Sequence, residues 1–322
     1  MFRNWHAWMG LAAVLCWTML VWTDNSQSIL PTGNLSRAAA SVEVRPLRIG
    51  VIPERNIFEQ RARFRILADY LSRELQQPVE LVTASSYENV IQDFADQQVD
   101  VAFLGSLVTV LTVDRVNAHL IAKTELLGGI STYRGVLFVP SDSKIKSFDD
   151  LSGKSIALVR TTTAANLFPM YEIIRRGLLK SPNPPKIIWV GTHDDVFTEV
   201  AERRADAGAI KDLRLDQLES SESSQQFVRL ATSPAVPESA LVIRDKLNPQ
   251  IAASVKRAIL TMDSTSAGRD ALKSFGAERF VPCQIEEYKA IFDMVDVVRD
   301  QWSQTGISVP PPARPISLPM KP

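Results

Sequence analysis

Cysteine and histidine are scarce in this chain of 322 residues, which contains two cysteines, Cys16 and Cys283, and three histidines. Cys16 lies in an apolar N-terminal run, so Cys283 has no partner if that run stays in a membrane or is removed. A disulfide framework is therefore not expected, and no Cys/His cluster has the spacing of metal ligands. A lone cysteine such as Cys283 is more often a small buried residue than a nucleophile. We expect neither a metal nor a cofactor.

Net charge is also lacking, because 36 Lys and Arg residues balance 36 Asp and Glu residues. The basic footprint of a nucleic-acid-binding protein is therefore absent. An anionic ligand would have to be caught by local donors rather than by a global positive field. The motifs of common catalytic sites are missing too: there is no nucleophile elbow, no GxGxxG, no phosphate loop and no triad at recognisable spacing. The sequence favours a binding protein and not an enzyme.

The most pronounced local feature is the apolar run from Trp8 to Trp22, which follows Arg3. Four of the six tryptophans (Trp5, Trp8, Trp17 and Trp22) lie toward its two ends, as in a membrane-interface belt. The run is near the lower limit for spanning a bilayer and slightly long for a signal peptide. It is either a cleaved signal or a retained inner-membrane anchor formed by residues 5–22. Both alternatives predict export to the periplasm or another extracytoplasmic compartment.

The rest of the chain alternates short apolar runs with helical patterns, which predicts βαβ units and parallel sheets. The alternation runs through once, restarts, and then returns to helices, so we expect two α/β lobes with chain crossings near 135–139 and 232–241. Each lobe is predicted to be a mixed, mostly parallel sheet flanked by helices. The predicted parts are a signal peptide or anchor (1–23), a polar linker (24–45), lobe 1 (46–137 plus 240–303), lobe 2 (138–239) and a proline-rich disordered tail (304–322).

Hydrophobic periodicity assigns the individual elements of both lobes. The predicted strands are 47–52, 79–82, 100–104, 136–139, 155–159, 186–190, 207–210 and 240–243. The predicted helices are 58–76, 86–97, 106–114, 164–178, 194–204, 248–262, 266–274 and 286–302.

Three hydroxyl side chains, Thr161, Thr162 and Thr163, follow the predicted strand 155–159 where a helix begins. Ligands of open α/β sheets bind beyond the carboxyl ends of strands, where helix N-termini present unpaired N–H groups. An oxyanion accepts many hydrogen bonds and needs such a density of donors. Plain N-capping, the alternative, needs only one threonine. Arg160, just before the run, is either a ligand clamp or a solvated charge at the rim.

His193 occupies the corresponding place after the predicted strand 186–190. Thr192 and Asp195 on either side of it form a capping-box pattern, which fixes the start of a helix. A histidine in that first turn either donates to an anion in the cleft or is an exposed loop residue.

Three further polar residues lie at the expected cleft edge. Ser106 is another hydroxyl at a helix start. Asp212 follows the predicted strand 207–210 and is either a cleft acid or part of a surface pair. Tyr133, just before the crossing, either points its phenol into the cleft or packs in the hinge.

Several short segments of this chain, taken together and in their order, resemble those of a known family. They are Leu47–Pro53 (LRIGVIP), Asp100–Gly105 (DVAFLG), Asp150–Lys154 (DLSGK), Gly191–Asp194 (GTHD) and Phe280–Pro282 (FVP). Over roughly 46–300 the chain resembles the PhnD-like phosphate, phosphite and phosphonate-binding proteins of ABC importers. The resemblance implies a type II periplasmic-binding-protein fold. It also implies a ligand held in the interlobe cleft by a tyrosine, a Ser-Thr-Ser run, a histidine and an acidic residue.

Carried over by position, the resemblance assigns the histidine to His193 and the tyrosine to Tyr133. The first two hydroxyls of the Ser-Thr-Ser run fall on Thr162 and Thr163. Asp212 is the candidate for the acidic residue.

The chain departs from the family pattern at five positions. Ala164 replaces the third hydroxyl of the run, and Ala165 replaces the glycine after it. Gly135 stands where a serine follows the cleft tyrosine, and Ser106 and Thr109 stand in place of the proline and tyrosine of a lobe 1 segment. The loss of two charge-assisted hydrogen bonds would weaken phosphonate binding by ~100-fold. Either the ligand differs, with Arg160 or Thr109 compensating, or this member has turned to sensing or partner binding.

The resemblance implies a monomeric, extracytoplasmic solute-binding protein that captures a small oxyanion of the phosphate, phosphite or phosphonate class for ABC-type import. Its partner would be the permease of the transporter. A retained N-terminal anchor would favour an alternative, a membrane-anchored sensory or adaptor module of the same fold. A cofactor-biosynthesis enzyme on this fold is the other alternative, and export and the missing catalytic set count against it.

Overall fold

The computed structural model describes residues 45–52, 57–86, 88–221 and 226–313. The predicted signal or anchor (1–23) lies outside these residues, as does nearly all of the predicted linker. Within the described ranges, none of the helices combines the length and the apolar character that crossing a bilayer requires. Residues Val44–Pro322 form one compact unit, and the fold below is the fold of that unit.

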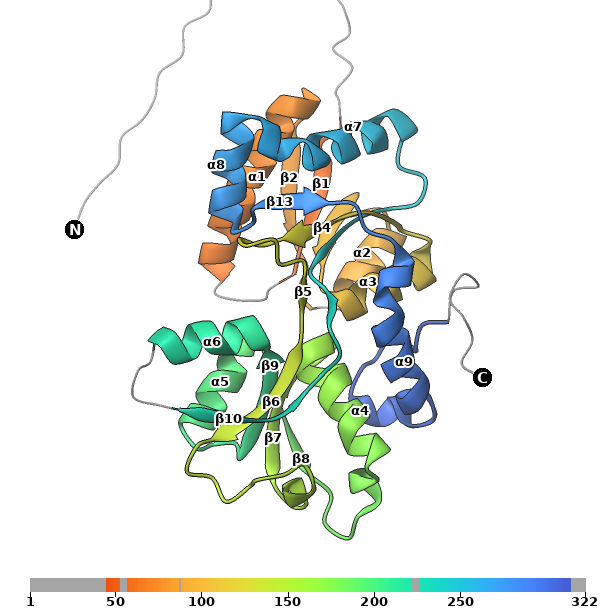
Figure 1. Cartoon of the computed structure of the whole chain (residues 1–322). Helices are drawn as coiled ribbons and strands as arrows, with labels where there is room; N and C mark the ends of the chain where they lie inside the picture. Colours follow the sequence, from red (N-terminus) through yellow and green to blue (C-terminus); the bar gives the residue numbers. More distant parts are fainter. Residues whose placement is uncertain (1–44, 53–56, 87, 222–225, 314–322) are drawn as a thin grey trace, which may run out of the picture. The chain divides into compact units, whose positions relative to one another are not determined.

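Lobe 1 is built on a six-stranded sheet with the strand order β13-β4-β12-β3-β1-β2 (Figure 1). The three central strands β12, β3 and β1 are buried along almost their whole length, which is typical of sheets covered on both faces. The strands are β1 (Leu47–Val51), β2 (Val79–Thr83), β3 (Val101–Leu104), β4 (His119–Glu125), β12 (Ala240–Ile243) and β13 (Arg279–Val281). The helices are α1 (Ile57–Leu75), α2 (Asn89–Ala95), α3 (Ser106–Val116), α7 (Pro249–Leu260) and α8 (Ser266–Phe275).

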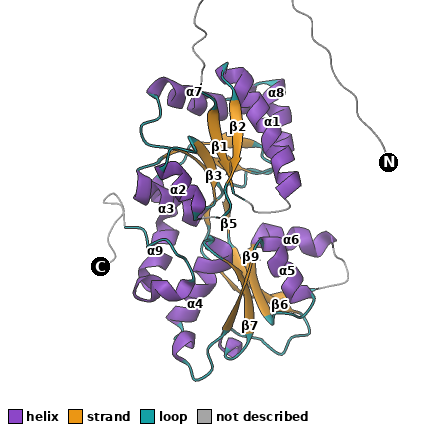
Figure 2. Ribbon diagram, turned by 180° about the vertical axis from the view of Figure 1, so that it is seen from behind, coloured by secondary structure: helices purple, strands orange, loops and turns teal. Residues whose placement is uncertain are grey.

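Lobe 2 is built on a five-stranded sheet with the strand order β10-β6-β9-β7-β8. The view from behind shows helices on both sides of this sheet (Figure 2). The strands are β6 (Gly135–Pro140), β7 (Ser155–Val159), β8 (Lys186–Val190), β9 (Ala207–Lys211) and β10 (Phe227–Thr232). The helical elements are the π-turn η2 (Thr163–Leu167), α4 (Phe168–Arg175), α5 (His193–Ala201) and α6 (Asp212–Ser221).

Both sheets are mixed, as predicted, but antiparallel pairs are more prominent than the sequence suggests. In lobe 2, β7 pairs in parallel with β8 and β9, whereas β6 pairs antiparallel with β9 and β10. The reason lies in the chain crossing. A strand that enters from the other lobe starts at the edge where its neighbours end, so it must run opposite to them. Gly135 accordingly pairs with Lys211, and Ala240 pairs with Leu104.

The two lobes are joined by a short antiparallel ribbon formed by β5 (Thr132–Tyr133) and β11 (Val236–Pro237). Below it, the Arg134 guanidinium donates to the Ser233 carbonyl at 2.8 Å, and the Gly135 N–H donates to the Ser233 hydroxyl at 2.8 Å. The first crossing therefore lies at β5, just before the predicted 135–139, and all of β6 belongs to lobe 2.

The C-terminal segment differs from the predicted lobe assignment. Helix α9 (Lys289–Val298) lies along α4 of lobe 2, although residues 240–303 were all expected in lobe 1 (Figure 1). Its buried residues join the larger of two hydrophobic clusters, which also contains side chains of α3 and of lobe 2. The apolar stripe predicts the helix correctly, but the stripe carries no information about which lobe covers it.

The predicted disordered tail (304–322) is wrong in its first part. The 3-10 helix η6 (Arg299–Thr305) continues α9, and the Trp302 indole donates to the Val309 carbonyl at 2.8 Å. The Ala313 N–H donates to the Asp114 carboxylate of α3 at 2.9 Å. Prolines remove N–H donors but leave their carbonyls available, so a proline-rich segment can still be fixed by donors from the body. Residues 314–322 lie outside the described residues.

Candidate functional site

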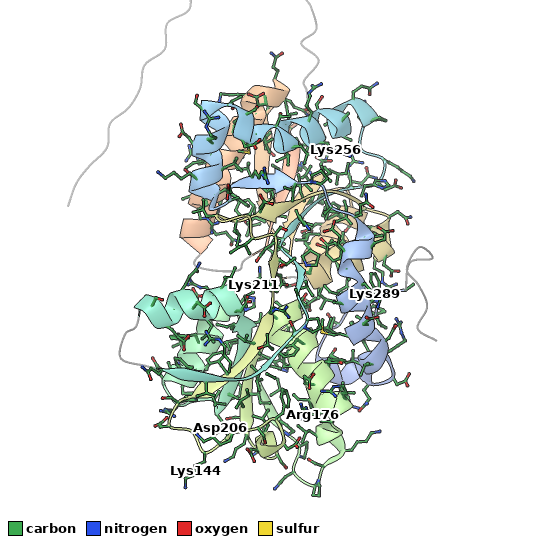
Figure 3. The ribbon with its side chains drawn as sticks, in the orientation of Figure 1. Lys144, Arg176, Asp206, Lys211, Lys256 and Lys289 are labelled. Atoms are coloured by element: carbon green, nitrogen blue, oxygen red, sulfur yellow. The ribbon has the colours of Figure 1, made fainter. Side chains whose placement is uncertain are left out.

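A cavity of about 140 Å³ is lined by side chains of both lobes. Lobe 1 contributes Arg63 and the ring of Phe275, and lobe 2 contributes Lys211 and Arg214 from the end of β9 and the start of α6. Glu238 from the crossing segment also lines it. Figure 3 shows Lys211 at the level between the two sheets, whereas Lys144 and Lys256 lie toward opposite ends of the body. A ligand in this cavity would touch both lobes.

The charge balance of this cavity is positive. Arg63, Lys211 and Arg214 are the cationic residues among its described lining residues, and Glu238 is the acidic one. The Arg214 guanidinium is also paired with the Asp194 carboxylate. Glu238 is only 5% exposed, and its Oε2 lies 2.9 Å from Lys211 Nζ. The Lys211 ammonium also lies 4.2 Å from the centre of the Tyr133 ring. A buried carboxylate needs such a partner.

Arg214 connects the cavity to the start of α5. Its Nε and Nη2 donate to the two carboxylate oxygens of Asp194, both at 2.7 Å. This fork-on-fork pair fixes the plane of the guanidinium, while Nη1 reaches the Gln217 side chain at 3.2 Å. The pairing holds α5 and α6 together at the edge where β8 and β9 end.

His193 lies beside that pair, half-buried, in the first turn of α5. The predicted capping box is confirmed: the Asp195 N–H donates to the Thr192 hydroxyl at 3.1 Å, and the Thr192 N–H donates to the Asp195 carboxylate at 2.8 Å. The start of α5 is therefore fixed by local sequence, and the position of the imidazole at the sheet edge is fixed with it.

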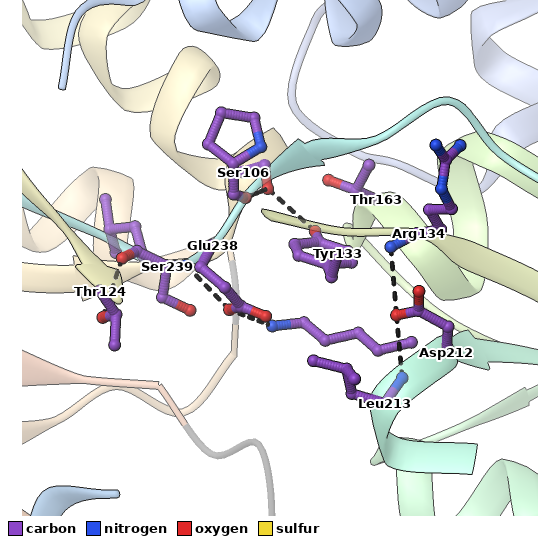
Figure 4. Close-up of polar contacts among 12 residues, drawn as sticks. Ser106, Thr124, Tyr133, Arg134, Thr163, Asp212, Leu213, Glu238 and Ser239 are labelled. Carbon is purple, nitrogen blue, oxygen red and sulfur yellow. Dashed lines mark hydrogen bonds and ion pairs between the residues drawn. The ribbon is translucent and has the colours of Figure 1, made fainter. Parts of the chain in front are cut away.

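Ser106, Tyr133 and Thr163, predicted from separate parts of the chain, come together at the start of α3 (Figure 4). The Ser106 hydroxyl donates to the Pro237 carbonyl at 2.7 Å, so it accepts the bond from the Tyr133 phenol at 2.9 Å. The Leu107 N–H donates to the Thr163 hydroxyl at 2.9 Å, which joins lobe 1 directly to lobe 2. We call Ser106, Leu107, Tyr133 and Thr163 the α3 node. Burial raises the pKa of Tyr133, so the phenol stays a neutral donor.

Thr161 and Thr162 are also engaged with the protein. The Thr162 hydroxyl donates to the Val159 carbonyl at 3.0 Å, and the Thr161 hydroxyl donates to the Glu88 carboxylate of lobe 1. Thr161 has φ +56°, a left-handed conformation that is rare for a β-branched residue. Such strain costs of order 1–3 kcal/mol and persists only where surrounding structure enforces it. The turn after β7 is thus held in one shape by contacts to the other lobe.

The sequence of the chain matches a known family. Residues 49–288 match the family described as "ABC transporter, phosphonate, periplasmic substrate-binding protein". The chain belongs to this family. The resemblance stated from the sequence is thereby confirmed, and the family is one of substrate-binding proteins rather than enzymes.

Individual relatives are distant. The phosphonates-binding periplasmic protein of Escherichia coli is 25% identical over 66% of this chain and 65% of its own length, just under two thirds. The phosphate-import protein PhnD of Mycolicibacterium smegmatis is 26% identical over 76% of this chain and 79% of its own. The structure of PhnD1 from Prochlorococcus marinus with methylphosphonate superposes with a TM-score of 0.68 at 20% identity, covering 78% of this chain and 97% of that one. The fold is the two-lobed type II periplasmic-binding-protein fold.

Two departures of this family member from the expected pattern contact each other. A Cβ atom added at Gly135 would lie 3.0 Å from the Ala164 Cα and 3.0 Å from the Phe168 ring. Ala164 and Ala165 are fully buried. A serine at position 135 would therefore require η2 or the Phe168 ring to shift by a few tenths of an ångström. The absence of a side chain at Gly135 lets η2 pack closely against β6.

Three other predicted residues have contacts away from the cavity. The Arg160 guanidinium stacks on Trp189, 4.4 Å from the ring centre, and donates to the Gly306 carbonyl at 2.9 Å. The buried Thr109 hydroxyl donates to the Leu104 carbonyl within its own helix start. The Asp212 carboxylate accepts from the N–H groups of Arg134 and Leu213 at 3.1 and 2.8 Å, which fixes the hinge to α6. Neither these three nor the other six predicted site residues (Ser106, Tyr133, Thr161, Thr162, Thr163 and His193) are among the described residues that line the cavity.

Arg63, Lys211 and Arg214 were not predicted as site residues. Lys211 is the last residue of β9, so its position at a strand end was a visible signal, but Asp212 was preferred there. Cys283 needs no functional role: burial raises the pKa of its thiol from 9.0 to about 12, so hardly any thiolate is present near neutral pH.

The α3 node can be tested by stability. Thr163→Val keeps the shape of the side chain but leaves the buried Leu107 N–H without its acceptor, which is expected to lower the free energy of unfolding by about 1–3 kcal/mol. Urea denaturation measures the change, and hydrogen exchange at the Leu107 amide should accelerate. Thr112→Val is the matched control, because that buried hydroxyl donates to the Val108 carbonyl within α3. Equal costs for the two variants would show that the contact between the lobes stabilises nothing.

Proposed function

We propose that this chain is an extracytoplasmic solute-binding protein that captures a small oxyanion of the phosphate, phosphite or phosphonate class and delivers it to the permease of an ABC transporter. The observation that carries the proposal is the cationic cavity, to which lobe 1 contributes Arg63 and lobe 2 contributes Lys211 and Arg214. The names of the E. coli, M. smegmatis and P. marinus relatives support the ligand class.

The mechanism we infer is closure about the β5–β11 ribbon. A ligand that contacts donors of both lobes binds the closed form more tightly than the open form and shifts the population toward it. Arg63 belongs to α1 of lobe 1 and Arg214 to α6 of lobe 2. An anion between them would therefore contact both lobes. His193, at the same edge of the lobe 2 sheet, is a proposed further donor. The Thr162 hydroxyl would have to give up its bond to the Val159 carbonyl before it could donate to a ligand. The closed monomer would be the form that the permease recognises.

Calorimetry on the full chain with phosphate, phosphite, methylphosphonate and sulfate tests the proposal. Arg214→Met is expected to weaken binding of the preferred anion about 10- to 100-fold, because it removes one charge-assisted hydrogen bond. Lys256→Met is the control, since that lysine is exposed on α7. The same titration of Thr162→Ala with His193→Ala tests the predicted donors, and unchanged binding would remove them from the site. If none of the four anions binds the unmodified chain, the proposed function is wrong.

A second candidate is a membrane-anchored sensory or adaptor module of the same fold. The observation that favours it is the α3 node, in which protein donors and acceptors already satisfy one another across the lobes. Such a module would depend on retention of residues 5–22. Mass spectrometry of the mature N-terminus decides between the candidates: cleavage supports a released periplasmic receptor, and an intact N-terminus supports the anchored module.

A further inference from the structure

An open groove of about 790 Å³ continues outward from the cationic cavity. The two hollows share five lining residues, which are Arg63, Leu126, Leu213, Gln217 and Gly276. Arg63 thus stands at the passage between them, with its guanidinium donating to the Phe275 carbonyl. The cavity and the groove are therefore adjacent, and a molecule whose charged end lies in the cavity can extend into the groove.

One wall of the groove is an apolar turn between β4 and β5. Leu127 is 77% exposed and Ile130 is 37% exposed, which makes them two of the few large hydrophobic side chains left open on the described surface. The turn is held in place: the Leu126 N–H donates to the Ile130 carbonyl at 2.7 Å, and the Gly128 N–H donates to the Glu278 carboxylate at 3.0 Å. Exposed apolar side chains on a fixed turn beside a charged cavity are typical of a ligand-binding surface.

The opposite wall is α6, through Leu213, Asp216, Gln217 and Ser220. Its one carboxylate, Asp216, is paired with Arg229 and so does not oppose an anion strongly. Gly276 keeps the floor open, because its φ is +88° and a Cβ there would lie 3.0 Å from the Arg63 guanidinium. The groove therefore changes from cationic at its inner end to apolar at Leu126, Leu127, Ile130 and Leu213.

We propose that the ligand is an amphiphilic anion: an oxyanion head in the cavity at Lys211 and Arg214, with an unbranched apolar chain of several carbons lying along Leu126, Leu127 and Ile130. This inference rests on the proposed function and narrows its substrate class from any small oxyanion to alkylphosphonates or similar chain-bearing anions. The cationic inner end complements the head, and the apolar turn complements the chain. Each methylene group removed from water in the half-open groove should strengthen binding about two- to fourfold.

Calorimetry of the full chain with methyl-, propyl-, pentyl- and heptylphosphonate tests this inference. The expected result is an affinity that rises about two- to fourfold per methylene until the chain reaches the end of the groove. Leu127→Ser should lower the ratio of heptyl- to methylphosphonate affinity by about tenfold. Ile66→Ser is the matched control, because Ile66 is a similarly exposed hydrophobic residue on α1 that lines neither hollow.

Each outcome has a separate meaning. If methylphosphonate binds and the affinity is the same for every chain length, the groove is not part of the site and the proposed function stands. If the affinity rises with chain length but Leu127→Ser leaves the ratio unchanged, the chain does not lie along this turn and the inference is wrong. If no phosphonate of any length binds, while phosphate, phosphite and sulfate also fail, the proposed function itself is wrong.

Discussion

Lys211→Met is expected to lower the free energy of unfolding by about 3–5 kcal/mol, as for other buried ion pairs that lose one partner. The Glu238 carboxylate is only 5% exposed, and Lys211 Nζ lies 2.9 Å from it. The Glu238 carboxylate also accepts a hydrogen bond from the Ser239 N–H at 3.1 Å. Without the ammonium, the carboxylate stays buried with one amide donor, which does not compensate its charge. Urea unfolding followed by circular dichroism measures the loss.

The double variant Lys211→Met with Glu238→Gln provides the control. Glutamine keeps the size of the side chain and removes the charge, so most of the lost stability should return. The coupling between the two sites, taken from the double-mutant cycle, should then be about 2–3 kcal/mol. A single variant that costs less than 1 kcal/mol, or a double variant that is no more stable than the single one, would contradict the structural role of the pair. Anion binding should be weaker in both the single and the double variant, because both lack the Lys211 ammonium.

Local patterns in the sequence predict the strands of both lobes well. All eight predicted strands are present with ends that differ by at most one residue, because each is a compact apolar run bounded by polar residues. The strand β4 was missed because its second half reads Lys123-Thr124-Glu125, three polar residues that are nevertheless buried. Lys123 pairs with Glu287, and Glu125 pairs with Arg279 at 2.6 Å. Those partners lie more than 150 residues away along the chain, so no local window reveals that they satisfy the charges.

In the site, too, neighbouring residues predict some features, whereas contacts between residues far apart in the sequence determine others. The capping box at Thr192 and Asp195 depends on residues three apart and was predicted correctly. The pairs Lys211–Glu238 and Arg214–Asp194 depend on the order of strands in the sheet and on the crossing ribbon, which periodicity does not specify. The hydroxyl run was located correctly at the carboxyl end of β7. The hydrogen bonds of Thr161 with Glu88 and of Thr163 with Leu107 join residues that are far apart in the sequence, so local patterns do not predict them.

A substitution in the C-terminal segment, at Trp302, is expected to have a similarly large effect on the free energy of unfolding. Trp302 is 7% exposed, packs in the larger hydrophobic cluster, and donates its indole N–H to the Val309 carbonyl at 2.8 Å. Trp302→Ala is therefore expected to lower the free energy of unfolding by about 3–5 kcal/mol, because it leaves a cavity in the larger hydrophobic cluster and removes the hydrogen bond that holds the proline-rich segment. Denaturant unfolding of the full chain measures the loss.

Val297→Ala is the control for that substitution. Val297 is on α9 too but is 36% exposed, so its truncation should cost about 0.5 kcal/mol or less. The comparison separates two descriptions of residues 299–313. If they are part of the body, as the bonds from Arg299 to the Pro312 carbonyl and from Ala313 to Asp114 indicate, Trp302→Ala must be far the more costly of the two. Similar costs would mean that the segment is a loose tail, as its proline content alone suggests.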